Sequence, residues 1–528
     1  MSEYLKYLAG KSIKGGLSRR EFMGRSAALG LGAVAANSLL TKTALAAGPI
    51  KGGIFKMGIG GGESTASLDP ARAASQVPFH LLRAYGECLL EVNADGSLNP
   101  RLAESFDSSS DAKTWSFKIR KGVEFHNGKT MTPDDVLQTM LRHSDKDSES
   151  GALGVMQGIK KLSVDGDNLI VELSEANADL PFLMSDFHLT IQPNGGRDDP
   201  AAGIGTGPYK LVQQEAGVRY SFERFGNYWD DSRAHFSGLE LTVMNDATAR
   251  TAALQSGQVH VINRVPPKVA GLLDRAPGLA VRNVSGRGHY AFVMHCDTEP
   301  FASKDLRNAL KLAINREEMV DKILRGYGTV GNDFPINSGY PLFDETIPQR
   351  TYDPEKAAAL YKASGHDGSP ISLRVSDVAF PGAVDAAQLF QESARKAGIP
   401  LDIKRVPSDG YWSDVWNKKP FCASYWEGRP VQDQMYSTAY VSGADWNETK
   451  FDNPAFDKLL VEAKGTLDQA KRKSLYSEMA YLVRDEGGLI LPMFNDYVEG
   501  ISDKVLGWEK NGVFELMNGL APQKCWFS

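Results

Sequence analysis

The amino-acid sequence predicts an α/β protein that is exported from the cytoplasm. Strand-like and helix-like hydrophobic patterns alternate along most of the chain, with no low-complexity tract and no fixed-period repeat. The chain has 528 residues, enough for two or three structural units around a large core. Its N-terminus has the pattern of a processing segment rather than of a folded unit.

Residues 1–46 have the organisation of a signal peptide. A basic stretch that ends at Arg25 precedes an apolar run over residues 27–40, and small residues follow at 44–46. The apolar run is shorter than the roughly 20 residues that cross a bilayer, and no later segment is apolar enough to do so. We therefore expect this segment to be removed rather than to anchor the protein.

The residues around Arg19 and Arg20 match the twin-arginine export pattern. The pair is followed by Phe22 and lies directly before the apolar run. Lys42 lies in the cleavage region, where general-secretion substrates usually avoid a positive charge. We expect a periplasmic protein that crosses the membrane already folded, with Arg19 and Arg20 as its export signal.

The charge of the processed chain narrows the range of partners. Removal of the signal peptide takes away seven basic and two acidic residues, which changes the formal net charge from −6 to −11. An acidic surface disfavours nucleic acid and anionic lipid. We expect no nucleic-acid partner.

The four cysteines form no recognisable metal or redox motif. They are Cys88, Cys296, Cys422 and Cys525, each more than 100 residues from the next. This spacing excludes a CxxC motif and a cysteine-based zinc cluster. The periplasm permits disulfides, so a Cys296–Cys422 bridge and four free buried thiols both remain open.

A parallel strand–helix–strand unit is the clearest local prediction. Residues 371–375 form a short strand pattern, residues 385–397 have helical spacing and end at Gly398, and residues 401–406 form the next strand pattern. Such a short crossover joins parallel strands.

Other elements follow from capping residues and periodicity. We predict a strand over 115–120, a helix capped by Thr132, a helix that Asn245 and Asp246 open and Gly257 ends, a strand over 259–262, and a helix after Asp353. Apolar residues recur at helical spacing from Asp305 to Leu324, which predicts a buried helical stretch there.

No enzyme motif is present. Gly122 precedes Gly128-Lys129-Thr130 by five intervening residues, where a phosphate loop needs four. The nine histidines include no HExxH motif, and no GxSxG or SxxK serine occurs. We predict no catalytic residue, no metal site and no cofactor. A secreted hydrolase and a cofactor carrier remain as minor alternatives.

Residues 409–446 are unusually rich in aromatic side chains. They contain nine aromatic residues, including half of all tryptophans. Charged residues of both signs lie among them, and solute pockets combine apolar walls with a few orienting polar groups. The alternative is an ordinary aromatic core. The predicted ligand-binding residues of this segment are Tyr425, Trp426, Glu427, Arg429, Asp433 and Trp446.

A resemblance to a known family covers nearly all of the processed chain. The stretches that carry it are Asn99 to Phe106, Trp115 to Gly128, Thr132 to Val136, Gly205 to Lys210, Asn227 to Trp229, Thr248 to Gly257, Pro300-Phe301 and Leu306 to Arg316. Their content and order resemble the family 5 solute-binding proteins of ABC importers.

The resemblance implies a type II periplasmic-binding-protein clamshell, in which two α/β lobes close on a ligand. By analogy, residues 48–90, 205–285 and 490–528 make the first lobe, residues 91–204 an extra subdomain on it, and residues 286–489 the second lobe. The family places the loop after residues 421–424 at the cleft, opposite the turn over 58–64. Glu63 and Ser64 of that turn are therefore also predicted to contact the ligand.

The resemblance implies a solute but not its identity. Family members bind small peptides, and others bind nickel chelates, opines, oligosaccharides or glutathione. Peptide binders carry an Asp in a pattern where this chain has Glu427 and Arg429. Glu427 or Asp433 could replace that anion, and Arg429 could hold a ligand carboxylate. We expect a monomer that delivers a small peptide or amino-acid-like solute to inner-membrane ABC permease subunits.

Overall fold

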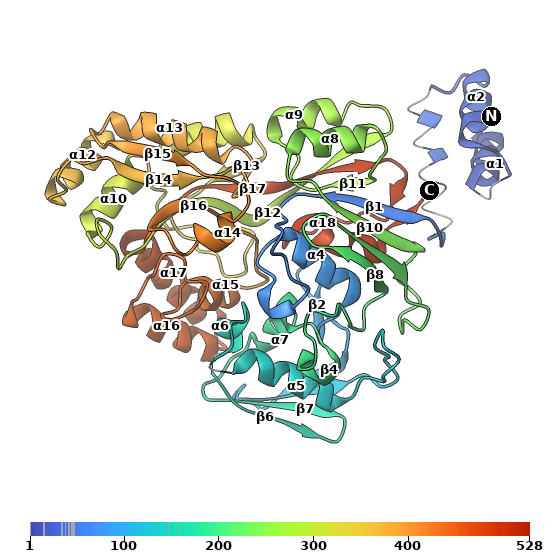
Figure 1. Cartoon of the computed structure of the whole chain (residues 1–528), viewed down its shortest axis with the longest axis horizontal. Coiled ribbons are helices and arrows are strands. Elements are labelled where there is room, and N and C mark those ends of the chain that lie inside the picture. Colours follow the sequence, from blue (N-terminus) through green and yellow to red (C-terminus); the bar gives the residue numbers. More distant parts are fainter. Residues whose placement is uncertain are drawn as a thin grey trace.

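The computed structural model describes residues 2–13, 16–32, 35–36, 39–40, 43, 48–145, 147–156 and 158–528. Lys42 and the predicted cleavage region at 44–46 lie outside the described residues, as does the side chain of Arg19. Helices α1 (Ser2–Ile13) and α2 (Arg19–Ala28) stand beside the main body, at the upper right of Figure 1. No helix in the described ranges is long and apolar enough to span a bilayer.

One mixed sheet of 11 strands runs through the body (Figure 1), in the order β15-β14-β16-β12-β17-β11-β1-β10-β9-β8, with β13 paired to β17. We call the end with β1 and β8–β11 the first lobe, and the end with β14–β16 the second lobe. The strands are β1 (Ile54–Ile59), β8 (Tyr209–Glu215), β9 (Arg219–Arg224), β10 (Gly238–Val243), β11 (Val261–Ile262), β12 (Leu279–Met294), β13 (Gly328–Val330), β14 (Ile371–Val375), β15 (Leu401–Arg405), β16 (Phe421–Trp426) and β17 (Leu489–Ser502).

The two longest strands, β12 and β17, pass from one lobe into the other. They pair antiparallel, and the register shifts between Ser285 and His289. Gly286 lies in this interval, and a Cβ there would come within 2.7 Å of the Tyr497 ring. The glycine therefore allows the tyrosine to lie against β12. Strands that cross between lobes with irregular central pairing are suited to act as a hinge.

A smaller unit with its own core packs below the first lobe (Figure 1). Its antiparallel sheet has the order β4-β5-β7-β6. The predicted strand over 115–120 is confirmed as β5, and the predicted cap is confirmed: Thr132 Oγ1 accepts from the backbone N–H of Asp135 at 3.3 Å. The elements are β4 (Ala103–Ser108), β5 (Thr114–Ile119), α5 (Pro133–Ser144), α6 (Leu153–Met156), β6 (Ile159–Asp165), β7 (Asn168–Leu173) and α7 (Leu180–Leu183).

Helices cover the strands of the second lobe. The predicted strand–helix–strand unit is confirmed, since β14 and β15 pair in parallel around α13. The predicted helix after Asp353 is also confirmed as α12. The helices are α10 (Lys304–Leu312), α11 (Arg316–Met319), α12 (Pro354–Ala363), α13 (Ala383–Arg395), α14 (Tyr411–Asp414), α15 (Gln432–Ala439), α16 (Pro454–Gly465) and α17 (Gln469–Glu486).

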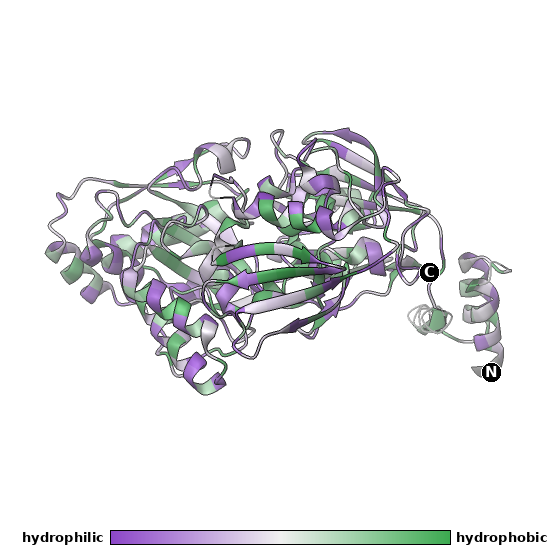
Figure 2. Ribbon diagram, turned by 90° about the horizontal axis from the view of Figure 1, so that it is seen from below, coloured by the Kyte–Doolittle hydropathy of each residue, from purple (hydrophilic) through white to green (hydrophobic). Residues whose placement is uncertain are grey.

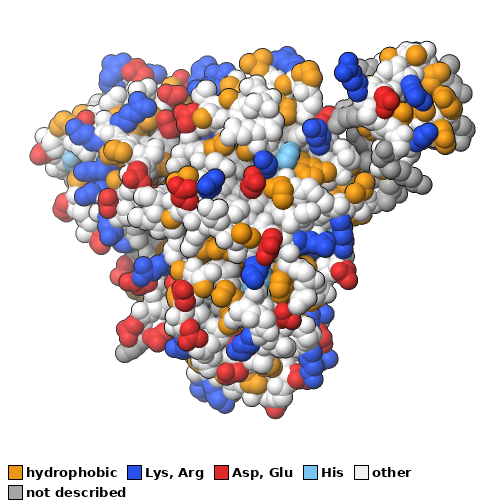
Figure 3. Space-filling view, turned by 45° about the vertical axis from the view of Figure 1, so that its right-hand side comes forward, with side chains coloured by type: hydrophobic (Ala, Val, Ile, Leu, Met, Phe, Trp, Pro, Cys, Tyr) orange, Lys and Arg blue, Asp and Glu red, His pale blue; other side chains and the backbone are white. Residues whose placement is uncertain are grey.

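Shorter elements complete the first lobe and its junctions. The helices are α4 (Gln76–Tyr85), α8 (Ala247–Gln255), α9 (Pro267–Leu273), α18 (Glu515–Asn518) and α19 (Ala521–Lys524), with 3₁₀ turns at Pro70–Arg72, Phe187–Leu189 and Pro193–Gly196. The strands are β2 (Leu90–Val92), β3 (Leu98–Pro100), β18 (Val505–Leu506) and β19 (Trp526–Phe527). Figure 2, seen from below, shows hydrophobic and hydrophilic residues mixed along the strands at the front of the view, and Figure 3 shows acidic and basic side chains interspersed over the face in view.

Two sequence predictions differ from the structure, and one open question is resolved. The stretch from Asp305 to Leu324 is not one helix, because Asn315 interrupts it and caps α11, and a π-helical turn follows at Val320–Leu324. The strand predicted over 259–262 is only Val261–Ile262. All four cysteines are free thiols. The predicted lobe boundaries stay a prediction.

Candidate ligand-binding site

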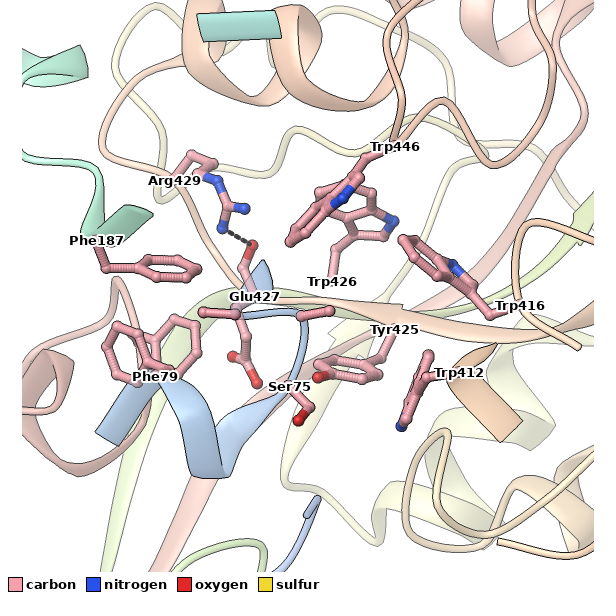
Figure 4. A pocket seen from close by; sticks show the side chains of 13 residues that line it. Ser75, Phe79, Phe187, Trp412, Trp416, Tyr425, Trp426, Glu427, Arg429 and Trp446 are labelled. Atoms are coloured by element: carbon pink, nitrogen blue, oxygen red, sulfur yellow. Dashed lines mark hydrogen bonds between the residues drawn. The ribbon is translucent and has the colours of Figure 1, made fainter. Parts of the chain in front are cut away.

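A small cavity lies where the two lobes meet (Figure 4). It has room for about 50 Å³, which corresponds to a few water-sized spheres. The first lobe contributes Ser75 and the start of α4, and the second lobe contributes the end of β16 and the loop after it. The N-cap residue Ser75 makes no side-chain capping bond to α4.

Aromatic rings form most of the cavity wall. Tyr425 and Trp426 end β16, Trp412 lies on α14, and Trp416 and Trp446 come from the loops on either side. Neighbouring rings meet edge to face, with centroids 5.1 Å apart for Trp412 and Tyr425 and 5.8 Å apart for Trp426 and Trp446. Three phenyl rings close the other side, those of Phe79, Phe187 and Phe514.

Glu448 lies behind this wall and holds two of its indoles. Its carboxylate accepts hydrogen bonds from the indole N–H of Trp426 at 2.7 Å, from the indole N–H of Trp416, and from the hydroxyl of Ser424 at 2.5 Å. Burial raises the pKa of Glu448, and the three hydrogen bonds oppose this rise. Sequence reasoning missed Glu448, which lies two residues beyond the aromatic segment.

The carboxyl group of Glu427 lines the cavity and bridges the lobes. Its Oε1 accepts a hydrogen bond from Gln76 Nε2 of α4 at 2.7 Å, and Gln76 Oε1 in turn accepts from the hydroxyl of Tyr425 at 2.8 Å. Glu427 Oε2 is buried and makes no hydrogen bond of standard geometry, although the nearby Tyr497 hydroxyl helps to lower the pKa of the carboxyl. The Gln76 amide of the first lobe therefore contacts two residues of the second lobe.

A group of buried acids surrounds Arg264 beside Glu427. Arg264 lies 3.4 Å from Glu427 Oε1 and 2.9 Å from Glu515 Oε1, and its guanidinium covers the Tyr425 ring at 4.2 Å. Burial, and then the charge of Glu515, raises the pKa of Glu427 to about 7, while Arg264 opposes the rise. Burial also raises the pKa of nearby Glu499 well above its usual value.

Arg429 is a buried cation that makes no ion pair among the described residues. It is 5% exposed and lines the cavity. Its Nη1 makes only long contacts, at 3.4 Å and 3.3 Å, to the backbone carbonyls of Glu427 and Gly428, and its Nε has no partner. Figure 4 shows the guanidinium directed toward the space between Phe187 and Trp446.

The structure places the other predicted residues around the cavity rather than in its lining. Glu63 accepts a hydrogen bond from the Trp412 backbone N–H at 3.3 Å, and the Ser64 hydroxyl donates to Asp409 at 3.4 Å, so both join the lobes beside the cavity. Asp433 is fully buried and lies 3.3 Å from Lys464. The charge of Asp433, on α15, is thus balanced by Lys464 inside the protein.

Distant residues that the sequence did not single out complete the site. Gln76, Arg264 and Glu515 lie far from the aromatic segment in the sequence, and Glu448 lies just beyond it. Within the described ranges, no group of three or more His, Cys, Asp or Glu side chains is arranged to hold a metal ion.

Residues 97–448 match the family model of the bacterial extracellular solute-binding proteins, family 5. This match covers about two-thirds of the chain. The chain belongs to this family.

Relatives of this family 5 protein include several binding proteins. It is 26% identical over 468 residues to di/tripeptide-binding protein 1 of Pseudomonas aeruginosa, covering 80% of this chain and 86% of the relative. It is 24% identical over 436 residues to the glutathione-binding protein GsiB of Pectobacterium atrosepticum, covering 79% and 84%. The chain is therefore a solute-binding protein.

Solved structures of similar fold cover almost the whole described chain. The periplasmic binding protein AgaA of A. tumefaciens R10, in complex with agropinic acid, matches with a TM-score of 0.83 and 22% identity over 90% of this chain and 99% of that one. DppA of Helicobacter pylori, in complex with peptide STSA, matches with a TM-score of 0.83 and 20% identity over 90% and 98%. The predicted two-lobed, type II periplasmic-binding-protein fold is confirmed.

Proposed function

We propose that this solute-binding protein captures a small peptide or amino-acid-like carboxylate between its lobes and delivers it to an ABC importer. The observation that carries the proposal is the guanidinium of Arg429, buried at the cavity without an ion pair. Against the effect of burial, its charge and that of His188 lower the pKa of the buried carboxyl of Asp186, but Arg429 and Asp186 form no ion pair, and a buried charge that is not directly paired is costly. A solute carboxylate would supply the counter-ion through a bidentate pair.

The remaining polar atoms of the cavity suit an amino-acid-like molecule. Glu427 Oε2 is an unpartnered acceptor, and the Trp412 indole N–H is an unpartnered donor. Glu427 and Arg429 both line the cavity, so it offers groups of opposite charge to a zwitterion. The names of relatives support the class, since they include di/tripeptide-binding and glutathione-binding proteins.

The cavity is lined by residues of both lobes, and this explains how a solute would be captured between them. A ligand favours closure only if it interacts differently with the open and closed states. A solute here would touch α4 of the first lobe and the β16 loop of the second at once. It would therefore stabilise the closed arrangement over an open one.

Arg429→Lys tests the carboxylate pair. In a thermal-shift screen of amino acids, dipeptides and tripeptides, we expect binders to stabilise the processed protein by about 2.7 kcal/mol at a hundredfold excess over Kd. The variant keeps the charge but loses the planar fork, so calorimetric titration should give at least tenfold weaker binding, about 1.4 kcal/mol.

The matched control is Arg307→Lys, at an arginine that is also buried but binds backbone carbonyls inside the second lobe. Its affinity per folded molecule should equal that of the parent protein. Equal affinity in the Arg429 variant, or a best ligand without any carboxylate, would refute the proposal.

We also propose export through the twin-arginine pathway, on the basis of Arg19 and Arg20 before the apolar run. Replacing both with Lys preserves charge but removes the guanidinium groups that the export receptor reads. Unprocessed precursor should then accumulate in the cytoplasm, as immunoblots of cell fractions would reveal. Normal periplasmic processing of the double variant would exclude this pathway.

A further inference from the structure

The indole of Trp416 in the cavity wall stands nearly perpendicular to two neighbouring indoles. The ring planes of Trp412 and Trp416 meet at 71°, with centroids 6.1 Å apart, and those of Trp416 and Trp446 meet at 86°, with centroids 5.8 Å apart. We call these three residues the indole corner. Figure 4 shows them along one side of the cavity, facing the space that Arg429 enters from the other side.

A corner of perpendicular walls suits a compact group better than a flat one. Aromatic rings pack offset and parallel or edge to face, and here the adjacent indoles already pack edge to face with one another and point in different directions. A branched, roughly spherical group can pack against walls that point in different directions. The shape therefore favours a compact substituent over an aromatic side chain.

The charges around the corner favour a cation as that substituent. Glu448, behind the wall, receives the indole N–H of Trp416, and its three hydrogen bonds partly offset the burial that raises its pKa. Glu427 presents a buried, unpartnered oxygen at the cavity. Aromatic faces attract cations, most strongly those of Trp. The same wall already attracts cations, since the Arg429 guanidinium lies 5.6 Å from the Trp426 ring centroid.

The wall offers such a cation few hydrogen-bond acceptors. A primary ammonium has three N–H donors to satisfy, and the faces of three indoles supply no oxygen. Among the lining side chains, Glu427 Oε2 is a buried acceptor without a partner. A primary ammonium would therefore leave donors unsatisfied, which costs free energy, whereas a quaternary ammonium has no N–H donor and a tertiary ammonium has only one.

We propose that the solute carries an alkylated ammonium group, seated in the indole corner with Glu427 as its counter-ion. This rests on the proposed function, because the solute's carboxylate is assigned to Arg429. The ligand class is thus a small betaine-like zwitterion: a quaternary or tertiary ammonium a short distance from a carboxylate. The two ends interact with different residues, which allows each to be tested separately.

Three probes of graded chemistry separate shape from charge. Glycine betaine has the trimethylammonium group and a carboxylate, 3,3-dimethylbutanoate replaces the nitrogen by carbon at the same shape, and glycine keeps the charge without the methyl groups. By calorimetric titration we expect glycine betaine to bind at least tenfold more tightly than either. If the carbon analogue or glycine binds as tightly as glycine betaine, the indole corner is not a site for alkylated ammonium groups.

Trp446→Leu tests the corner itself, and Trp508→Leu, outside the cavity, is its control. We expect the Trp446 variant to lose most of the preference for glycine betaine over 3,3-dimethylbutanoate and the control to keep it, with melting temperatures showing that both variants fold. An unchanged preference in the Trp446 variant overturns the inference.

Failure of this inference can be distinguished from failure of the proposed function. If 3,3-dimethylbutanoate binds as well as glycine betaine and both bind more weakly to Arg429→Lys, the proposed carboxylate site is supported and the proposed ammonium site is refuted. If no carboxylate ligand, including the peptides of the screen, binds more weakly to Arg429→Lys, the proposed function is refuted. The ammonium assignment is then refuted as well.

Discussion

Glu427 lines the cavity and also lies among other buried acidic side chains. Its oxygen accepts from Gln76, Arg264 lies beside it, and Glu515 shares that guanidinium. Removing the carboxylate from water favours its protonated form, and one arginine shared by two acids compensates only in part. The residue can therefore gain or lose a proton near neutral pH.

The raised pKa of Glu427 predicts how stability depends on pH. The folded state keeps this proton up to pH about 7, whereas the unfolded chain loses it near its ordinary value of 4.5. Between these values the folded state binds more protons, so the free energy of unfolding falls as pH rises, by roughly 1.4 kcal/mol for each unit of raised pKa.

Glu427→Gln removes this titration while keeping a side chain of the same shape. Urea unfolding of the solute-free processed protein between pH 4.5 and 7.5 should therefore give a flatter profile for the variant, and greater relative stability at the upper end. Some slope should persist because the pKa of Glu499 is raised too. Parallel profiles for variant and parent would show that Glu427 does not titrate in this range.

At the scale of elements, the break between α10 and α11 illustrates how one side chain sets a boundary. Apolar residues continue at helical spacing across it, but Asn315 adopts extended backbone angles and its Oδ1 accepts from the Glu318 backbone N–H at 3.2 Å. An Asn side chain competes with the helical backbone and satisfies a free N–H at a new helix start. Periodicity alone carried no signal of this.

Asn315→Ala should destabilise the protein by about 1 kcal/mol, because the first turn of α11 loses its cap. Asn315→Asp should retain most of the stability, since aspartate caps equally well and lies at the positive end of the helix. Denaturant midpoints of the two variants would test this. An alanine variant as stable as the aspartate one would show that the cap contributes little.

For the molecule as a whole, closure of the lobes depends on few direct contacts at the cavity. Gln76 of α4 makes two of them, to Glu427 and Tyr425, and Glu63 makes another with the backbone of Trp412. These contacts come from segments about 350 residues apart in the sequence, and they form only when the lobes approach. They contribute to the closed arrangement without determining which solute it holds.

Gln76→Ala should therefore favour the open arrangement, because it removes both hydrogen bonds and leaves polar groups of the second lobe unpaired. Small-angle X-ray scattering of the solute-free processed protein should give a larger radius of gyration for this variant. Gln391→Ala is the control, since that amide bonds to Leu401 within the second lobe. If both variants scatter like the parent protein, Gln76 does not bias closure.

The sequence by itself determined the local features of this protein. Thr132 and Asp353 mark helix starts, the pattern over 371–406 encodes a parallel crossover, and the aromatic segment supplies most of the cavity wall. Each depends on residues near one another in the chain, so that propensity, capping and period suffice. The family blocks likewise indicated the two-lobed fold.

The tertiary structure alone decided which charges face the cavity. Glu427, Arg429 and Asp433 looked equivalent in the sequence, yet Lys464 neutralises Asp433 inside the second lobe, Arg264 and Glu515 flank Glu427, and Arg429 is left without an ion pair. Whether a charge is available to a ligand depends on partners that the fold brings from distant segments. These partners cannot be predicted from the local sequence, because the packing of the whole chain determines which side chains pair across the lobes.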